Sequence, residues 1–277
     1  MASGHDNCLR YFKYTIGEAV SIKTIEGHNA WIRSLAFNQE YLATGSDDSS
    51  LKLWKLNGNS QLEHVHTVHT NESNKAYYWS LSFIKEGMIA AGRGQNDNFA
   101  IRVWDFEGFN KPKILYGHRN IVRKLCILEK ENVFISISDD CTMKVWDIDT
   151  LDLKKTIYAH EKPINCLASN QKLGIVATWS QDFSLKIWVI RGLYKCVMNI
   201  FISDRILVLE SFEKFNAIIS GTANGLFQGR SWMNGCLLFT FSIGMEIHSI
   251  LCDERQDLIF TGDSSGKISV WYLSYFT

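Results

Sequence analysis

Histidine, hydroxyl and carboxylate side chains recur together in this chain at regular spacings. The order is repeated three times, as His28, Thr44 and Asp48, as His118, Ser136 and Asp140, and as His160, Thr178 and Asp182. A hydroxyl, a general base and a carboxylate that orients the base are the parts of an acyl-transfer triad. An active site has no reason to be copied three times, so these residues are interpreted as structural rather than catalytic.

A tryptophan completes each copy, six residues after the aspartate: Trp54, Trp146 and Trp188. A buried indole N–H, hydroxyl and imidazole each need a hydrogen-bond partner. A chain of hydrogen bonds from tryptophan through serine or threonine to histidine and on to aspartate satisfies all of them. The pattern therefore predicts three buried polar networks.

The elements that position these residues are short strands. LKLWKL (51–56), IRVWDF (101–106), MKVWDI (143–148), LKIWVI (185–190) and ISVWYL (268–273) alternate aliphatic and polar residues, which is typical of half-buried strands. The tryptophans are about 42 residues apart, and ISGTANGLFQGRSW (219–232) is a weaker copy with Arg230 at the tryptophan position. Forty-two residues before Trp54 lies Phe12, inside SGHDNCLRYF (3–12).

Four short strands per repeat, with Gly-His or Ala-His at one end and Trp-Asp at the other, resemble the WD-repeat β-propeller family. The resemblance covers nearly the whole chain and implies an all-β propeller in one domain, 1–277, with six complete four-stranded blades and a partial seventh at the N-terminus. The expected boundaries are 1–18 for the partial blade, then 19–56, 57–106, 107–148, 149–190, 191–232 and 233–277. Two alternatives stay open for the partial blade: a gene product that continues upstream of Met1, or a ring closed by six blades.

Composition argues against several classes of function. Lysine plus arginine and aspartate plus glutamate both number 29, so net charge gives no reason to expect nucleic-acid binding. The seven cysteines are scattered and never spaced CxxC, which favours free thiols in a reducing compartment. No signal peptide or membrane span is recognised, so an intracellular protein is expected, cytoplasmic or alternatively nuclear.

No cofactor or metal is expected. His64, His66 and His69 lie close together in sequence, and imidazoles grouped in this way are candidate metal ligands. They fall on a predicted outer strand, so we interpret them as facing solvent. Gly92-Arg93-Gly94 lacks the strand-then-helix setting of a dinucleotide loop.

A partner surface is predicted on one face of the propeller. The second repeat has two insertions on that face, TNESNKAYYW and RGQNDNF, which bring aromatic and arginine residues typical of interface hot spots. Tyr78 aligns with Ile32 and is predicted to be core. The predicted partner-binding residues are Trp31, Arg33, Asp47, Tyr77, Trp79, Arg93, Phe99, Ile121, Arg123, Asp139, Pro163, Asn165, Trp179 and Gln181.

The resemblance implies a non-catalytic scaffold that binds a protein or peptide. The partner is not named, because a fold alone does not determine function. The alternative is a substrate-recognition module of a ubiquitin-ligase or kinase-linked assembly. The chain has no F-box-like or RING-like segment, and its two Trp-Asp pairs continue as WDFE and WDID rather than with arginine or lysine at the fourth position. A propeller enzyme is the third and least favoured alternative.

Overall fold

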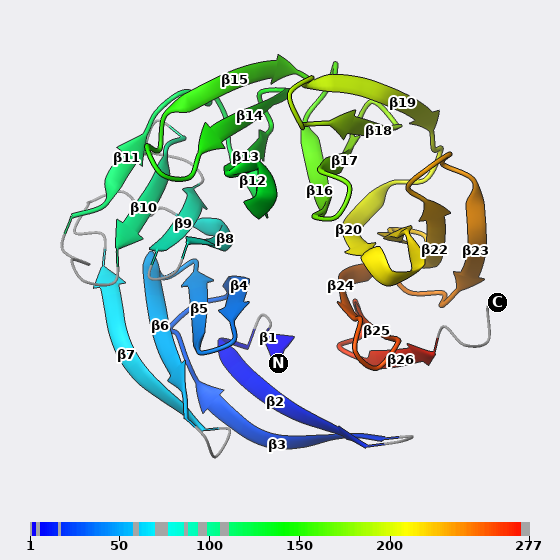
Figure 1. Ribbon diagram of the computed structural model, residues 1–277. Coiled ribbons are helices and arrows are strands. Elements are labelled where there is room, and N and C mark those ends of the chain that lie inside the picture. The colour runs from blue at the N-terminus through cyan, green and yellow to red at the C-terminus, as the bar shows by residue number, and fades with distance from the viewer. Residues whose placement is uncertain are drawn as a thin grey trace. The chain divides into compact units, whose positions relative to one another are not determined.

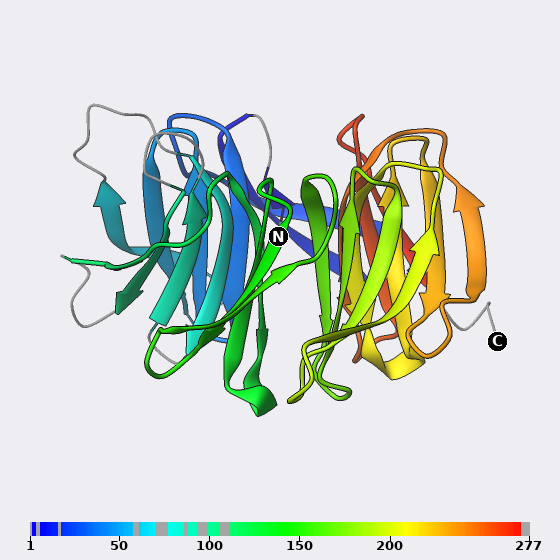
Figure 2. The same ribbon diagram turned by 90° about the horizontal axis from the view of Figure 1, so that it is seen from above.

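The computed structural model describes residues 2–3, 6–15, 18–57, 61–69, 77–85, 88–93, 99–105 and 111–272. These residues form antiparallel β-sheets that follow one another along the chain (Figure 1). The strands gather into two compact units, Met1–Leu125 and Cys126–Thr277. In both units the strands of a sheet lie side by side, with turns at the two ends (Figure 2). The predicted fold class, an all-β propeller, is confirmed.

The first unit holds three sheets. Their strands are β1 (Ala2–Ser3), β2 (Cys8–Thr15) and β3 (Glu18–Glu26); β4 (Ile32–Asn38), β5 (Tyr41–Ser46), β6 (Ser50–Leu56) and β7 (Leu62–His69); and β8 (Tyr78–Lys85), β9 (Met88–Arg93), β10 (Ile101–Asp105) and β11 (Lys113–Leu115). Strand β12 (Val122–Leu128) leads from the first unit into the second.

The second unit holds the remaining strands. They are β13 (Val133–Ser138), β14 (Thr142–Asp147) and β15 (Leu153–Tyr158), which share a sheet with β12; β16 (Ile164–Asn170), β17 (Ile175–Ser180), β18 (Ser184–Val189) and β19 (Lys195–Phe201); β20 (Ile206–Phe212), β21 (Ala217–Thr222), β22 (Leu226–Ser231) and β23 (Leu237–Ser242); and β24 (Ile247–Asp253), β25 (Leu258–Asp263) and β26 (Ile268–Tyr272). The helices among the described residues are two single 3₁₀ turns, η1 (Glu129–Glu131) and η2 (Glu213–Phe215).

Five sheets have four strands and two have three, within the described residues. The predicted count of six four-stranded blades is therefore not reached, because β24–β26 is a three-stranded sheet whose fourth strand was expected in residues 273–277, outside the described part. At the other end, β3 pairs with β2 from Cys8↔Glu26 onward. Each sequence repeat thus begins with the outer strand of the preceding sheet.

The turn between the second and third strands of each sheet has one residue in the left-handed region of backbone conformation. The seven residues, with φ between 54° and 81°, are Asn7, Ser49, Phe99, Cys141, Phe183, Gly225 and Gly266. In four turns the aspartate before this residue accepts from the backbone N–H that follows it: Asp48 Oδ1, for example, accepts from the Ser50 N–H at 2.9 Å and from the Ser50 hydroxyl at 2.6 Å. An aspartate followed by a left-handed residue is the turn chemistry that joins such strands.

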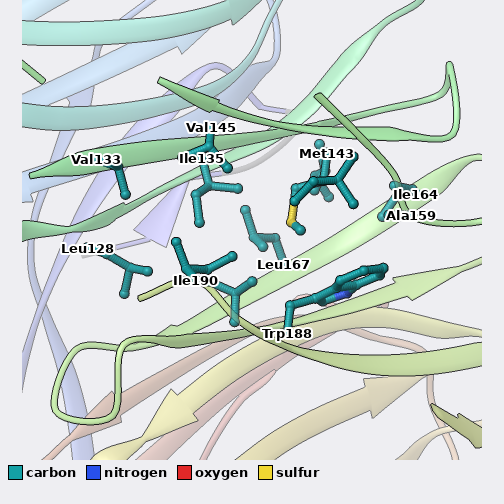
Figure 3. Close-up of a cluster of buried hydrophobic side chains, with 13 residues drawn as sticks. Leu128, Val133, Ile135, Met143, Val145, Ala159, Ile164, Leu167, Trp188 and Ile190 are labelled. Carbon is teal, nitrogen blue, oxygen red and sulfur yellow. The ribbon is translucent and has the colours of Figure 1, made fainter. Parts of the chain in front are cut away.

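Apolar side chains fill the spaces between successive sheets. In the second unit, Ile135, Met143 and Val145 of one sheet meet Leu167 and Trp188 of the next, all buried (Figure 3). In the first unit, Leu51 and Leu53 pack with Tyr78 and Trp104. Tyr78 is fully buried, as predicted. Each sheet therefore depends on its neighbour for a core, which is the property of repeat folds.

Candidate functional site

The first strand of most sheets contains a β-bulge near its start. The pairing register shifts at Ile32/Ser34, Tyr78/Ser80, Ile164/Cys166, Ile206/Val208 and Ile247/Ser249. One extra residue sits at each shift, namely Arg33, Trp79, Asn165, Leu207 and His248. A bulge redirects a side chain out of the alternating pattern, and bulges are frequent at functional sites. Arg123 follows buried Val122 as Arg33 follows buried Ile32.

Three of these side chains, Arg33, Trp79 and Arg123, form one stack with Trp31 in the first unit. The Arg33 guanidinium lies 4.8 Å from the centre of the Trp31 ring and 4.9 Å from that of the Trp79 ring. The Arg123 guanidinium lies 4.8 Å from the Trp79 ring. The order is therefore Trp31, Arg33, Trp79, Arg123, with indole and guanidinium alternating. Arginine over tryptophan is the most favourable of the cation–π pairs, and it prefers this separation. We call these four residues the Trp–Arg stack.

An ion pair orients the stack. Arg33 Nε and Nη2 donate to the Asp47 carboxylate at 2.9 Å and 2.7 Å, and the Asp47 N–H donates to the Trp31 carbonyl at 2.9 Å. The Arg33 and Asp47 side chains are only 26% and 15% exposed. A bidentate pair sheltered in this way fixes geometry as well as contributing energy. The stack is thus pre-organised.

Two hydrogen-bond donors of the stack are unused within the described part of the chain. The Trp79 Nε1 atom is buried and has no acceptor, and no bond is made by Arg33 Nη1. Trp31, by contrast, is 41% exposed and offers its ring to solvent. A buried donor without an acceptor costs about 1 to 3 kcal/mol. The stack can therefore gain from a ligand that brings an acceptor oxygen.

The other predicted partner-binding residues differ in burial. Tyr77, Phe99 and Ile121 of the first unit are half-buried, and the side chain of Arg93, like residues 70–76 and 94–98 of the two insertions, lies outside the described residues. In the second unit, Asp139, Pro163 and Asn165 are half-buried and Gln181 is exposed.

The prediction for Trp179 is wrong. This side chain is 1% exposed and packs in the core between β17 and β20 with Ile206 and Leu209. The corresponding Gly45 lies against Tyr78, where an added Cβ would come within 2.6 Å. At Trp179 the next sheet leaves space for the indole ring. The ring therefore points into the core and is not available to a partner.

The predicted polar networks around His28 and His160 are present in full. His28 Nδ1 lies 3.0 Å from Asp48 Oδ2 and His28 Nε2 lies 2.7 Å from Thr44 Oγ1, which also accepts from Trp54 Nε1 at 3.1 Å. Burial alone would raise the pKa of Asp48. Hydrogen bonds from His28, Ser50 and the Asn29 N–H outweigh burial, so the pKa lies well below its usual value.

The copy in the second unit has the same geometry. His160 Nδ1 lies 2.9 Å from Asp182, its Nε2 lies 2.8 Å from Thr178 Oγ1, and Trp188 Nε1 donates to that oxygen at 2.9 Å. Burial lowers the pKa of His160 to about 4, against the opposing effect of Asp182. Burial would raise the pKa of Asp182, but bonds from Ser184 and the charge of His160 lower it to about 2.

Two other sheets share the hydrogen bond from the tryptophan to the hydroxyl. Trp146 Nε1 donates to Ser136 at 2.9 Å and Trp271 Nε1 to Thr261 at 2.9 Å. His118 is buried at the end of the first unit, and Asp140 Oδ1 accepts from the Thr142 N–H and hydroxyl. In the sheet β8–β11, Trp104 Nε1 has no acceptor among the described residues.

Serines in the networks escaped sequence reasoning. Ser50 and Ser184 each place a hydroxyl 3.0 Å from the histidine Nδ1 and 2.6 Å from the aspartate Oδ1. The signal was present in the sequence, since a serine or threonine follows two residues after Asp48, Asp140 and Asp182. The networks are therefore closed rings of hydrogen bonds rather than linear chains.

The histidines of β7 make separate contacts. His64 Nε2 lies 2.7 Å from Thr67 Oγ1, and its ring meets Trp54 edge-on at 5.3 Å. His64 and His69 are exposed and His66 is half-buried. Within the part of the chain that the structure describes, no three His, Cys, Asp or Glu side chains are grouped as metal ligands, and no helix has the length and hydropathy of a membrane span.

Comparison with known proteins identifies the repeats. The family described as "WD domain, G-beta repeat" matches residues 19–55, 109–147 and 151–189. The chain is 28% identical over 159 residues to "Nuclear distribution protein PAC1-2" of Uncinocarpus reesii, covering 51% of this chain and 34% of that protein. It is 31% identical over 124 residues to "Probable coatomer subunit beta'" of Schizosaccharomyces pombe, covering 44% and 15%.

A third relative is "Cell division control protein 4" of Candida albicans, 26% identical over 108 residues, which cover 39% of this chain and 15% of that protein. The chain thus spans about a third or less of the length of these relatives. The matches fall on the repeats that the structure shows as successive antiparallel sheets. On its repeats and its sheet topology, the chain belongs to the WD-repeat β-propeller family.

Proposed function

We propose that this protein is a non-catalytic interaction scaffold and that the Trp–Arg stack is its docking site for a protein or peptide. The observation that carries the proposal is the stack itself, in which two indoles and two guanidiniums from three successive sheets are held in contact. Tryptophan and arginine are the residue types most enriched in interface hot spots. A rigid, partly exposed cluster of both supports docking.

The chemistry of the ligand follows from the unused donor of Arg33 and the exposure of Trp31. An acceptor oxygen would satisfy Arg33 Nη1, and the 41% exposed Trp31 suits an apolar or aromatic side chain. A carboxylate is the strongest acceptor for a guanidinium. We therefore propose an acidic peptide segment with an adjacent apolar residue.

The polar networks support a structural rather than catalytic role for their histidines. The Thr44 and Thr178 hydroxyls are fully buried, and each already contacts an indole N–H and an imidazole. A nucleophile must reach its substrate. The name of the coatomer relative describes a subunit of a larger assembly, which is in line with a scaffold.

The test is to replace Trp31, Trp79 and Arg123 together with alanine. We expect loss of captured partners, measured by affinity capture with quantitative mass spectrometry and then by calorimetric titration of the retained partner, with little change in melting temperature. The matched control replaces three exposed residues of the second unit that lie outside both proposed contacts, Tyr158, Met233 and Arg191, and keeps capture. Equal capture by both variants would overturn the docking site.

The number of blades is part of the same proposal. Seven sheets correspond to the seven repeat positions, and we propose a seven-bladed design in which the sheet that starts at β1 is incomplete. Strand β1 has two residues beside the eight of β2, so most of the inner part of that blade is not supplied by the described residues. An experimental structure with six closed blades and residues 3–14 packed outside them would contradict it.

A further inference from the structure

The outer strand of each four-stranded sheet forms its free edge, and one of these edges differs from the rest. An edge strand presents unpaired N–H and C=O groups, and proteins protect such edges with charges or by keeping the strand short. Strand β7 carries Glu63 and three histidines, β11 has three residues, and β15 carries Lys154 and Lys155. Strand β19, KCVMNIF, has one charge, at its first residue Lys195.

Both the exposure and the alternation of β19 suit pairing. Cys196, Met198 and Ile200 turn inward to the neighbouring cores. Val197 and Phe201 point outward and are 53% and 75% exposed, with exposed Asn199 between them. Strand β23 has no charged residue, and its exposed residues are Leu237 and Leu238 at its start, followed by Thr240 and Ser242, while its phenylalanines are half-buried. The outward apolar residues of β19 therefore form a stripe that reaches the end of the strand, whereas those of β23 stop at Leu238.

An aromatic pair ends this stripe. The rings of Phe183 and Phe201 lie 6.3 Å apart, and Phe183 is itself 40% exposed. Phe183 occupies the left-handed turn position with φ of 63°, which costs a bulky residue of order 1 kcal/mol or more. Glycine stands at the same position in two other sheets. A solvent-exposed phenylalanine kept in a strained conformation points to a contact with a ligand.

The charge at the other end of the strand indicates the ligand's chemistry. Lys195 has no acidic partner among the described residues, and it is the first residue of β19. We propose that β19 accepts an extended segment of a partner protein by antiparallel β-strand addition, with apolar side chains at alternate positions and an acidic residue opposite Lys195. Backbone hydrogen bonds give such pairing its affinity, and the alternate side chains give its specificity.

A defined peptide tests the proposal on the full chain. The probe is an acetylated, amidated nine-residue peptide in which valine and threonine alternate and the last residue is glutamate. We expect calorimetric binding and slower amide hydrogen exchange within β19. Binding should weaken at least tenfold when Val197 and Phe201 are both changed to lysine. The matched control changes Leu153 and Tyr158 of β15, two exposed apolar residues, to lysine and keeps binding.

Two further arms locate the contact and its occupant. Two further peptides are N-methylated at alternate residues, each in one of the two possible phases, so that each has one of its two hydrogen-bonding edges blocked. The peptide whose free edge faces β19 should retain binding, and the other should lose it. Equal binding to the Val197→Lys/Phe201→Lys variant, or protection mapped to another edge, overturns the proposal. Concentration-dependent dimer formation by the chain alone, abolished by that variant, also overturns it in favour of a second copy. The Trp31, Trp79 and Arg123 variant should bind the peptide normally, so failure here is distinct from failure of the docking site.

Discussion

The Thr178 hydroxyl makes two hydrogen bonds and is the centre of its network. It accepts from the indole of Trp188 and contacts the imidazole of His160. Thr178→Val keeps the shape but leaves both groups without this partner, so we expect a loss of about 2 to 4 kcal/mol in the free energy of unfolding. Urea denaturation measures it. Thr240→Val, at an exposed residue with one long hydrogen bond of 3.3 Å, should change stability by under about 0.5 kcal/mol.

His160 predicts a pH dependence of stability. Its pKa is about 4 in the folded protein and near 6.5 when unfolded, so the unfolded state binds more protons between these values. Its contribution is present above pH 6.5 and is lost as the pH falls toward 4, by up to about 3 kcal/mol. Melting temperatures from pH 4 to pH 7 test this. The His160→Asn variant should start lower at pH 7 and show a flatter profile; an unchanged slope would contradict the assignment.

Trp104 shows what happens when a network lacks its acceptor. In the other sheets the residue paired with the tryptophan on the neighbouring strand is followed, two residues later, by the hydroxyl. Leu42, for example, is paired with Trp54, and Thr44 carries the hydroxyl. Trp104 pairs with Ile89, so Ala91 takes the hydroxyl position. Ala91→Ser should give the indole an acceptor and raise the free energy of unfolding by about 1 kcal/mol, or the melting temperature by about 2 to 4 °C. A lower melting temperature would contradict this account of the sheet.

At the scale of elements, the turns between second and third strands can be tested with a matched pair of glycines. Gly225 and Gly266 both have positive φ, 74° and 81°. An added Cβ at Gly225 would come within 2.7 Å of the Met245 backbone, whereas at Gly266 it meets nothing within 4 Å. Gly266→Ala should cost about 1 kcal/mol for conformation alone. Gly225→Ala should lower the free energy of unfolding by at least about 1 kcal/mol more than Gly266→Ala does. Equal losses for the two variants, measured by thermal unfolding, would contradict the close contact at Gly225.

The strands themselves were predictable because alternation is local. The β-bulges were not, although they decide which residues reach the docking site. A bulge is one residue out of register, and whether it forms at Arg33 or Trp79 depends on the pairing of two strands rather than on the pattern of one. Sequence reasoning placed Trp31, Arg33, Trp79 and Arg123 on one face, but not in contact.

At the scale of the whole molecule, the balance of charge predicts poor solubility near neutral pH. The chain has 29 basic and 29 acidic residues and a sequence pI of about 7.1. Net charge near zero promotes association. Light scattering should peak near pH 7, and changing the exposed Phe37 and Val65 to glutamate should lower both the pH of the peak and its height. A peak that does not move would contradict a charge-based cause.

The sequence by itself determined the repeat, the strands and the membership of the polar networks. Period and alternation are properties of neighbouring residues, and because these turns have the same length, a hydroxyl ten residues before a tryptophan lies two residues along the paired strand from the residue opposite the tryptophan. Only the tertiary structure decided that Trp179 is core and that Arg33 lies between two indoles. Both depend on the space that one sheet leaves beside the next, and that space is set by side chains of the neighbouring sheet rather than by the local pattern.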